Sequence, residues 1–94
     1  MFFVTFRIRC NHQSRIEIIQ TLQGYARKAK ELKGCTDVHV YNDTEDENAF
    51  FLIEEWLDHR DLEEHVASDL FAALRGSKEL LAKPPEIRFM AEDK

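Results

Sequence analysis

The fold is decided by the stretch Ala49–Leu57, which reads AFFLIEEWL. Successive residues of a β-strand point to opposite faces, so this stretch divides into two sets. One face carries Phe50, Leu52, Glu54 and Trp56, and the other carries Phe51, Ile53, Glu55 and Leu57. Both sets begin with apolar side chains, which is typical of a strand buried on both sides. The sequence therefore predicts a sheet whose two faces are both covered.

Strands and helices alternate on either side of this strand. Alternating apolar residues predict strands, and apolar residues at helical spacing predict helices. In chain order the other predicted elements are a strand at 2–10, a helix at 14–33, a strand at 35–43, a helix at 58–76 with a break at Ser68, and a strand at 86–90. Ser14 and Glu17 have the spacing of a capping box, in which each side chain satisfies a backbone N–H at the helix start.

The order β-α-β-β-α-β is that of the ferredoxin-like α+β fold, an antiparallel four-stranded sheet with both helices on one face. The helices cover one face of this sheet, and the chain has no third layer for the other. We therefore expect a second copy of the sheet to cover it. The result would be a two-fold homodimer with a barrel-like interior around an apolar cavity.

Length and charge limit the classes of partner. The 94 residues are few enough for one domain spanning residues 1–94, with the charged residues 91–94 as a flexible tail. Thirteen Lys and Arg against eighteen Asp and Glu leave a net charge of −5. A surface of this sign gains nothing from counterion release on a polyanion, so neither nucleic acid nor an anionic membrane is an expected partner.

The cysteines and the start of the chain indicate a cytoplasmic location. Cys10 and Cys35 lack CxxC spacing, and the apolar stretch at the N-terminus is too short for a signal peptide. We therefore expect reduced thiols. The four histidines and two cysteines show no metal-ligand spacing, so no metal site is predicted.

One ordered set of motifs resembles a known family. Lys33-Gly34-Cys35 is followed by an acidic turn, by the strand Phe50–Asp58, and by Leu62-Glu63-Glu64-His65-Val66-Ala67-Ser68. This order is similar to the antibiotic biosynthesis monooxygenase family of dimeric α+β barrels. Its members typically have Gly-Cys at the second strand, Glu-x-Trp at a strand end, and a helix with Leu-x-x-His-x-x-Ser. The specific residues lie within 34–68, although the element order matches over nearly the whole chain.

The resemblance implies a homodimer with one small-molecule cavity per subunit between sheet and helices. Enzymes of the family include monooxygenases that oxidise quinol-like aromatics without metal or organic cofactor. In these enzymes the substrate anion itself reacts with oxygen, and the pocket supplies deprotonation, orientation and oxyanion stabilisation. Other members isomerise small sugar-derived signals, degrade haem, or have no known reaction, so family alone does not fix function.

Two departures from the family pattern narrow these options. Many quinol-oxidising relatives have Pro-His-Phe after the helix serine, whereas this chain has Ser68-Asp69-Leu70-Phe71. That stretch is similar to the haem-degrading branch, but the position of the branch's iron-ligating histidine is Arg75 here. Arginine stays protonated and has no lone pair to donate to iron. Haem degradation is therefore disfavoured.

Three residues are the candidates for catalysis: His65, Trp56 and Glu54. Histidine side chains in general have an unperturbed pKa of about 6.5, so His65 could accept a proton from a phenolic substrate, or it could be a half-buried histidine bonded to a backbone carbonyl. Trp56 could stack on an aromatic ligand or be a core residue. Glu54 shares a strand face with Trp56, so it would be an interior carboxylate with a partner such as His65 or Arg7. A one-residue change of register would put Glu55 in its place.

Three further residues are candidates for lining the ligand pocket: His39, Tyr41 and Arg7. His39 and Tyr41 share a face of their predicted strand and could form a polar wall, or be partly exposed. Arg7 could bind an anionic substrate or the dimer partner, or be a solvated surface charge.

The leading hypothesis is a cofactor-independent monooxygenase-like enzyme acting on a small aromatic or quinol, with His65 as proton acceptor and Trp56 as stacking wall. The alternative is a non-catalytic small-molecule-binding or dimerisation domain of the same family. An isomerase of small hydroxyketones would need the same acid–base residues.

Overall fold

The computed structural model describes residues 1–92 of the chain. Its elements are β1 (Phe2–Arg9), α1 (Arg15–Lys30), β2 (Cys35–Asn42), β3 (Ala49–Trp56), α2 (His59–Val66), α3 (Asp69–Arg75) and β4 (Glu86–Ala91). Two short 3-10 turns, η1 (His12–Ser14) and η2 (Lys78–Leu80), precede α1 and β4. The order confirms the ferredoxin-like α+β prediction, and the second helix is divided into α2 and α3 at the predicted break near Ser68.

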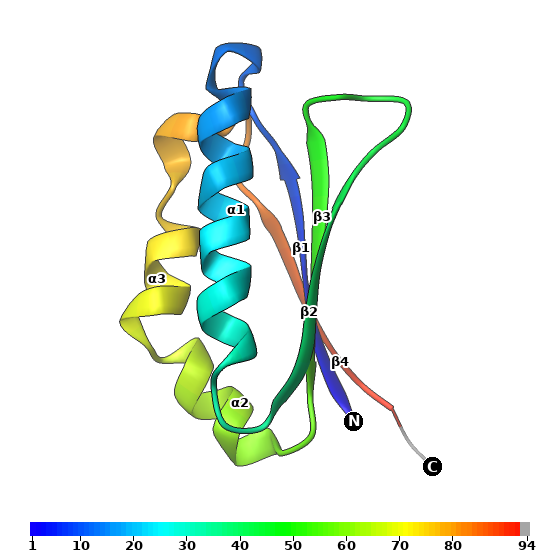
Figure 1. Ribbon diagram of the computed structural model, residues 1–94, viewed down its shortest axis with the longest axis vertical. Helices are drawn as coiled ribbons and strands as arrows, with labels where there is room; N and C mark the ends of the chain where they lie inside the picture. The colour runs from blue at the N-terminus through cyan, green and yellow to red at the C-terminus, as the bar shows by residue number, and fades with distance from the viewer. Residues whose placement is uncertain (93–94) are drawn as a thin grey trace.

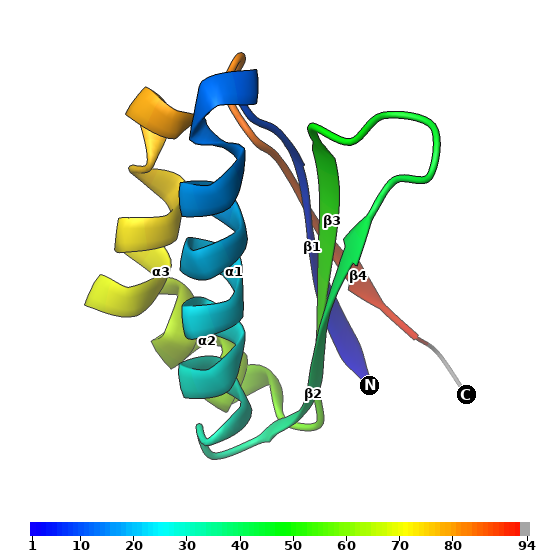
Figure 2. The same cartoon turned by 45° about the horizontal axis from the view of Figure 1, so that its top comes forward.

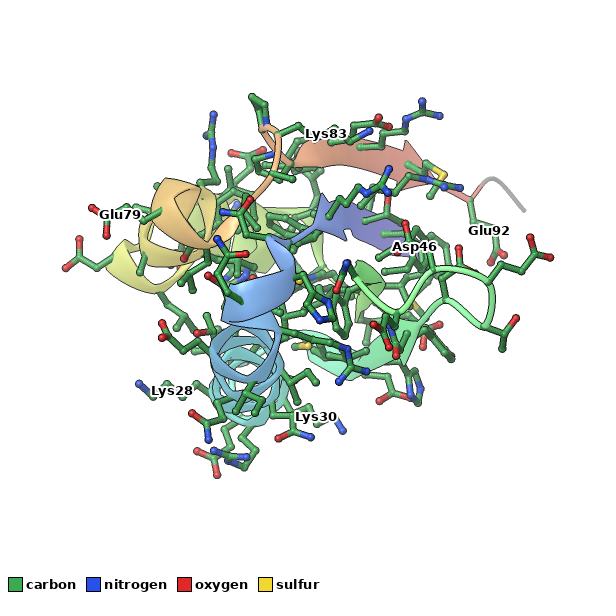
Figure 3. The ribbon with its side chains drawn as sticks, turned by 90° about the horizontal axis from the view of Figure 1, so that it is seen from above. Lys28, Lys30, Asp46, Glu79, Lys83 and Glu92 are labelled. Carbon is green, nitrogen blue, oxygen red and sulfur yellow. The ribbon has the colours of Figure 1, made fainter. Side chains whose placement is uncertain are left out.

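The four strands form one antiparallel sheet in the order β2-β3-β1-β4. All three helices lie on the same side of this sheet (Figure 1). Seen from above, α1 lies toward the β2 edge, and β4 forms the far edge (Figure 3). The chain therefore covers β2, β3 and β1 more completely than β4.

The register assigns every strand side chain to a face. The pairs Phe2–Trp56, Val4–Glu54 and Phe6–Leu52 place the apolar residues of β1 and β3 on the helix-facing side. There they join the apolar stripe of α1 in one buried core. The strand faces predicted from the alternation in 2–10 and 49–57 are thus the faces observed.

The opposite face of the sheet has no cover among residues 1–92, as a rotated view also shows (Figure 2). Half-buried apolar side chains lie on it, including Phe3, Phe51 and Ile53. Tyr41 and Met90 on the same face are 53% and 48% exposed. This face, which carries both apolar and charged side chains and which we call the open face, is the one that the sequence predicted a second copy would cover.

The capping box predicted at Ser14 is wrong. The Ser14 side chain makes no capping hydrogen bond, because the chain enters α1 through the turn η1. In that turn the Arg15 N–H donates to the His12 carbonyl, and the Ser14 N–H donates to Asn11 O at 2.9 Å. With φ −100° and ψ 7°, Ser14 does not have the extended backbone that an N-cap needs.

A glycine makes the turn from α1 into β2. Gly34 has φ +86°, a left-handed conformation that favours glycine. A Cβ atom at this position would lie 2.7 Å from Cβ of Asp61, in the first turn of α2. Gly34 therefore lets α2 pack closely against the start of β2.

The end of the chain is partly held. Ala91 pairs with Phe2 in the sheet, and the Glu92 N–H donates to Met1 O at 2.9 Å. Residues 93–94 of the predicted tail lie outside the described residues. Within residues 1–92, no helix has the length and apolar character needed to cross a membrane.

Candidate functional site

Four side chains from three elements meet beneath the helices. Tyr25 comes from the middle of α1, Glu54 and Trp56 from the end of β3, and His65 from the last turn of α2. Their exposed fractions are 4%, 0%, 0% and 3% in that order. We call these four residues the buried polar cluster.

Hydrogen bonds connect the members of the cluster around the Glu54 carboxylate. Tyr25 Oη donates to Glu54 Oε2 in a short hydrogen bond, and Trp56 Nε1 donates to Glu54 Oε1 at 2.9 Å. His65 Nε2 lies 2.7 Å from Tyr25 Oη and 3.2 Å from Glu54 Oε1. The Trp56 ring stacks on the His65 ring, with centroids 4.9 Å apart and planes at 27°. Each polar group of Glu54, Tyr25 and Trp56 therefore has a partner.

The same geometry assigns the tautomer of His65. Tyr25 has one hydroxyl proton, and it is used in the bond to Glu54. His65 Nε2 must then donate to Tyr25 Oη, since a bare nitrogen at this place would face only the lone pairs of the phenol and of Glu54 Oε1. The Nε2–H tautomer leaves Nδ1 with its lone pair. That Nδ1 atom is buried and has no hydrogen-bond partner.

The Glu54 carboxylate is placed to stabilise a proton that arrives on Nδ1. A buried carboxylate is costly unless it is paired, and hydrogen bonds alone compensate only part of that cost. When His65 accepts a proton at Nδ1, the imidazolium lies 3.2 Å from Glu54 Oε1 and becomes its counter-charge. The carboxylate–imidazole pair thus resembles the orienting pair of acid–base catalysis, in which the carboxylate fixes the ring and stabilises its charged form.

The neighbouring acids stay protonated. Burial and the adjacent Glu54 raise the pKa of the Tyr25 phenol above its usual value. Burial, with the Glu54 charge as the second cause, raises the pKa of the Cys35 thiol to about 11. At neutral pH Tyr25 therefore acts as a hydrogen-bond donor, and Cys35 is a thiol of low reactivity.

Two caps fix His65 in place. The Asp58 side chain accepts from the N–H groups of Arg60 and Asp61 and starts α2. At the other end, Ser68 Oγ donates to the His65 carbonyl at 2.6 Å and accepts from the Phe71 N–H at 3.3 Å. The Phe71 ring then meets the His65 ring edge-on, with centroids 5.3 Å apart and planes at 84°.

An apolar groove runs between β4 and the helices α2 and α3. The part beside α2 has a volume of about 570 Å³ and is lined by Phe2, Leu62, Val66, Phe89, Met90 and Ala91, with His59 and Glu63 at its rim. The part beside α3 has a volume of about 510 Å³, and its lining includes Val66, Ser68, Phe71, Arg75, Pro85 and Ile87. Because Val66 lines both parts, we treat them as one groove, the β4 groove. Phe71 contacts both this groove and His65, so it separates the groove from the buried polar cluster.

Comparison with known families identifies the chain. Residues 1–76 match the sequence model of the family described as antibiotic biosynthesis monooxygenase. The chain belongs to the antibiotic biosynthesis monooxygenase family. This match covers every element of the fold except η2 and β4, and it includes the whole buried polar cluster.

Several solved structures share the fold of this chain. A conserved protein from Methanosarcina mazei superposes with a TM-score of 0.87 at 24% identity, over 98% of this chain and 92% of that one. A candidate antibiotic biosynthesis monooxygenase from Deinococcus radiodurans superposes with a TM-score of 0.91 at 18% identity, over 100% of this chain and 94% of that one. A protein from Mycobacterium tuberculosis superposes with a TM-score of 0.87 at 20% identity, over 99% of this chain and 95% of that one. No curated protein matches the chain in sequence.

In this antibiotic biosynthesis monooxygenase family member, the three residues predicted as catalytic lie together. Glu54 and Trp56 share the helix-facing side of β3, and His65 contacts both. Trp56 is fully buried and stacks on His65, which fits the core role that the sequence left open beside stacking on a ligand. Within residues 1–92, no three His, Cys, Asp or Glu side chains form a group that could hold a metal ion.

The three predicted pocket residues lie elsewhere. His39, Tyr41 and Arg7 are on the open face, since they pair with Ile53 and Phe51 of β3. His39 Nε2 lies 2.6 Å from Asp37 Oδ2, and the Arg7 guanidinium lies 5.5 Å from the centre of the Phe51 ring. The sheet thus separates all three from the buried polar cluster.

Sequence reasoning missed Tyr25. This residue falls within the helix predicted at 14–33, and the structure places it among the buried residues of α1. A tyrosine that is buried needs a partner for its hydroxyl, and this general requirement was the available signal. The partners themselves are 29 and 40 residues away in sequence, so only the fold identifies them.

Proposed function

We propose that the protein is a cofactor-independent monooxygenase-like enzyme that acts on a small hydroxyaromatic or quinol-type substrate. The observation that carries this proposal is the buried, unpartnered Nδ1 of His65 on a ring whose other nitrogen is fixed by Tyr25 and Glu54. Buried polar atoms are nearly always paired, so an orphan of this kind in a cluster of titratable groups points to a missing proton donor.

The first step is proton transfer from the substrate hydroxyl to His65 Nδ1. The resulting imidazolium is stabilised by Glu54, and the electron pair of the broken O–H bond remains on the substrate anion. That anion then donates electrons to O₂. Overall, the hydroxyl-bearing carbon and a ring C–H carbon both become carbonyls, and one oxygen atom of O₂ enters the product. The other oxygen atom leaves as water with the ring hydrogen and the proton that His65 returns, so the substrate supplies all the electrons.

The substrate approaches from the β4 groove. Phe71 stands between this groove and His65, so its side chain must adopt another rotamer before a ligand can contact Nδ1. Tyr25, Glu54 and Trp56 do not line the groove and act as positioning residues for the imidazole. The catalytic contact is therefore assigned to His65 alone.

The open face supports a homodimer. Its apolar residues, with Ile53 near the middle, would be covered if two sheets packed face to face. His39, Tyr41 and Arg7 would then contact the partner subunit. An Ile53→Asp variant is expected to sediment as a folded monomer at micromolar concentration, whereas wild type sediments as a dimer. A monomeric wild type would contradict this part of the proposal.

Measuring oxygen uptake with 1-naphthol, a hydroxyaromatic, and with small quinols tests the chemistry. The sharpest variant is His65→Gln, because its amide N–H replaces the Nε2–H donor while the basic Nδ1 lone pair is lost. We expect a loss of about 10²-fold or more in rate, which is the range for removal of a general base. His12→Gln is the matched control, since His12 is an exposed histidine outside the cluster.

The outcomes separate two candidate functions. Uptake by wild type that disappears in His65→Gln and persists in His12→Gln supports the enzyme. The alternative, a non-catalytic small-molecule binder, is favoured by one observation: all four cluster residues are at most 4% exposed, as in a purely structural network. Measurable binding with no uptake above the uncatalysed rate would establish that alternative and overturn the enzyme.

A further inference from the structure

The two ends of the β4 groove carry different charged groups. At the α2 end, His59 Nδ1 lies 2.6 Å from Glu63 Oε1, so the groove has a carboxylate with an imidazole beside it at this end. At the α3 end, Arg75 lines the groove and takes part in none of the ion pairs found within residues 1–92. Between the two ends the lining is mostly apolar. The groove is thus a mostly apolar surface with a guanidinium at the α3 end and a carboxylate at the α2 end.

We propose that the β4 groove binds an elongated hydroxyaromatic anion, with its rings along Val66 and Phe89 and its carboxylate on Arg75. Ligand pockets are usually apolar with a few polar groups that fix orientation, and the two parts of the groove are each of ligand size. Phe89 is 55% exposed although it faces the helices, so a flat ring system would bury it. This inference rests on the proposed function for the hydroxyl group, which must reach His65.

Electrostatics favour the ligand carboxylate at the Arg75 end of the groove, away from Glu63. The chain carries a net charge of −5 and repels anions at long range. Arg75 is in the last turn of α3, where the helix dipole contributes about half a negative charge. A full guanidinium charge outweighs that dipole, and its planar donors can hold a carboxylate with two hydrogen bonds. A lysine at the same position would supply the charge without the paired geometry.

The position of Arg75 also orients the ligand. Phe71 is one helical turn before Arg75 on α3, and its ring contacts His65. A ligand held at Arg75 therefore places its apolar body along Phe71 and Val66, the residues nearest to His65 in the groove. An uncharged ligand would lack this anchor and could bind in either direction.

Calorimetric titration with a matched pair of ligands tests the inference. The pair is 2-naphthol and 6-hydroxy-2-naphthoate, which differ only by the carboxylate at the far end of the rings. We expect wild type to bind the carboxylate form about five- to tenfold more tightly, the range of a partly exposed charge-assisted contact. Arg75→Gln should remove this preference without changing the affinity for 2-naphthol, and Arg75→Lys should retain part of it.

Two controls make the result specific. Arg27→Gln removes an exposed arginine from α1, outside the groove, and should leave both affinities unchanged. Phe89→Ser alters an exposed groove residue and should weaken both ligands equally while the chain stays folded.

Three results would overturn the inference: equal affinity for the two ligands, a preference that survives in Arg75→Gln, or no binding of either. A Phe89→Ser variant that changes the association state instead of ligand affinity would also overturn it, by assigning the groove to a second copy. The titration measures binding alone, so a carboxylate preference without oxygen uptake would refute the enzyme but keep this site. Oxygen uptake without a preference for the carboxylate ligand would support the enzyme and refute the carboxylate site at Arg75.

Discussion

Two glutamates adjacent on β3 have opposite surroundings. Glu54 faces the helices, is 0% exposed and accepts hydrogen bonds from Tyr25 and Trp56. Glu55 faces the open side and is only half-buried. The residue type and the strand are the same, so the face alone decides whether the carboxylate belongs to a site. The helix-facing side is buried within the chain, whereas the open face is only partly buried.

The largest difference in stability between the two faces should appear when each glutamate is replaced by alanine in turn. Glu54→Ala leaves the Tyr25 and Trp56 donors unpaired in the interior and removes the counter-charge of His65, so we expect a loss of about 3–5 kcal/mol in the free energy of unfolding. Glu55→Ala should cost less than about 1 kcal/mol. Urea unfolding followed by far-UV circular dichroism measures both. Equal losses would remove the distinction between the two faces.

The two tyrosines give a second matched pair. Tyr25→Phe deletes a buried hydroxyl that donates to Glu54 and accepts from His65, so it should cost about 1–3 kcal/mol. Tyr41→Phe makes the same change on the open face and should lie within about 0.5 kcal/mol of wild type. The same urea titration applies. A costly Tyr41→Phe would mean that its hydroxyl has a partner in the dimer.

The buried acids near Glu54 should make the free energy of unfolding depend on pH in the alkaline range. The pKa of the Cys35 thiol is raised from 9.0 to about 11 in the folded chain. Between these two pH values the thiol ionises in the unfolded chain while it stays protonated in the folded chain. The unfolded state has then released more protons, so the free energy of unfolding should fall between pH 9 and about pH 11. The Tyr25 phenol adds to this fall above pH 10. Cys35→Ala should flatten the first part of the decline and leave stability at pH 7 nearly unchanged, as measured by thermal unfolding at each pH.

The smallest effect is expected at Arg7 on the open face. Its guanidinium lies over the Phe51 ring, a contact worth about 0.5–1 kcal/mol at an exposed site. Arg7→Met keeps the apolar stem and removes the charge, so the loss for the monomer should not exceed that amount. A larger loss in the dimer than in the Ile53→Asp monomer would place Arg7 in the interface.

The sequence predicted the elements and the strand faces because both depend on local periodicity. The alternation in 49–57 separates Glu54 from Glu55, and the family-like motif includes His65. The sequence could not relate the faces of different strands to one another. His39 and Arg7 were therefore grouped with Glu54, although pairing with β3 puts them on the other side. The Tyr25 contacts depend on how α1 lies over the sheet, which no local pattern specifies.

The interruption at Ser68 determines which side chains can meet. An unbroken helix turns about 100° and rises about 1.5 Å per residue. Over the six positions from His65 to Phe71, that geometry would point the two side chains about 120° apart and separate them by about 9 Å along the axis. In the folded chain their ring centroids are instead 5.3 Å apart. A single hydroxyl at the bend thus brings an imidazole and its aromatic neighbour together, and straightening this segment would dismantle the pair without altering either residue.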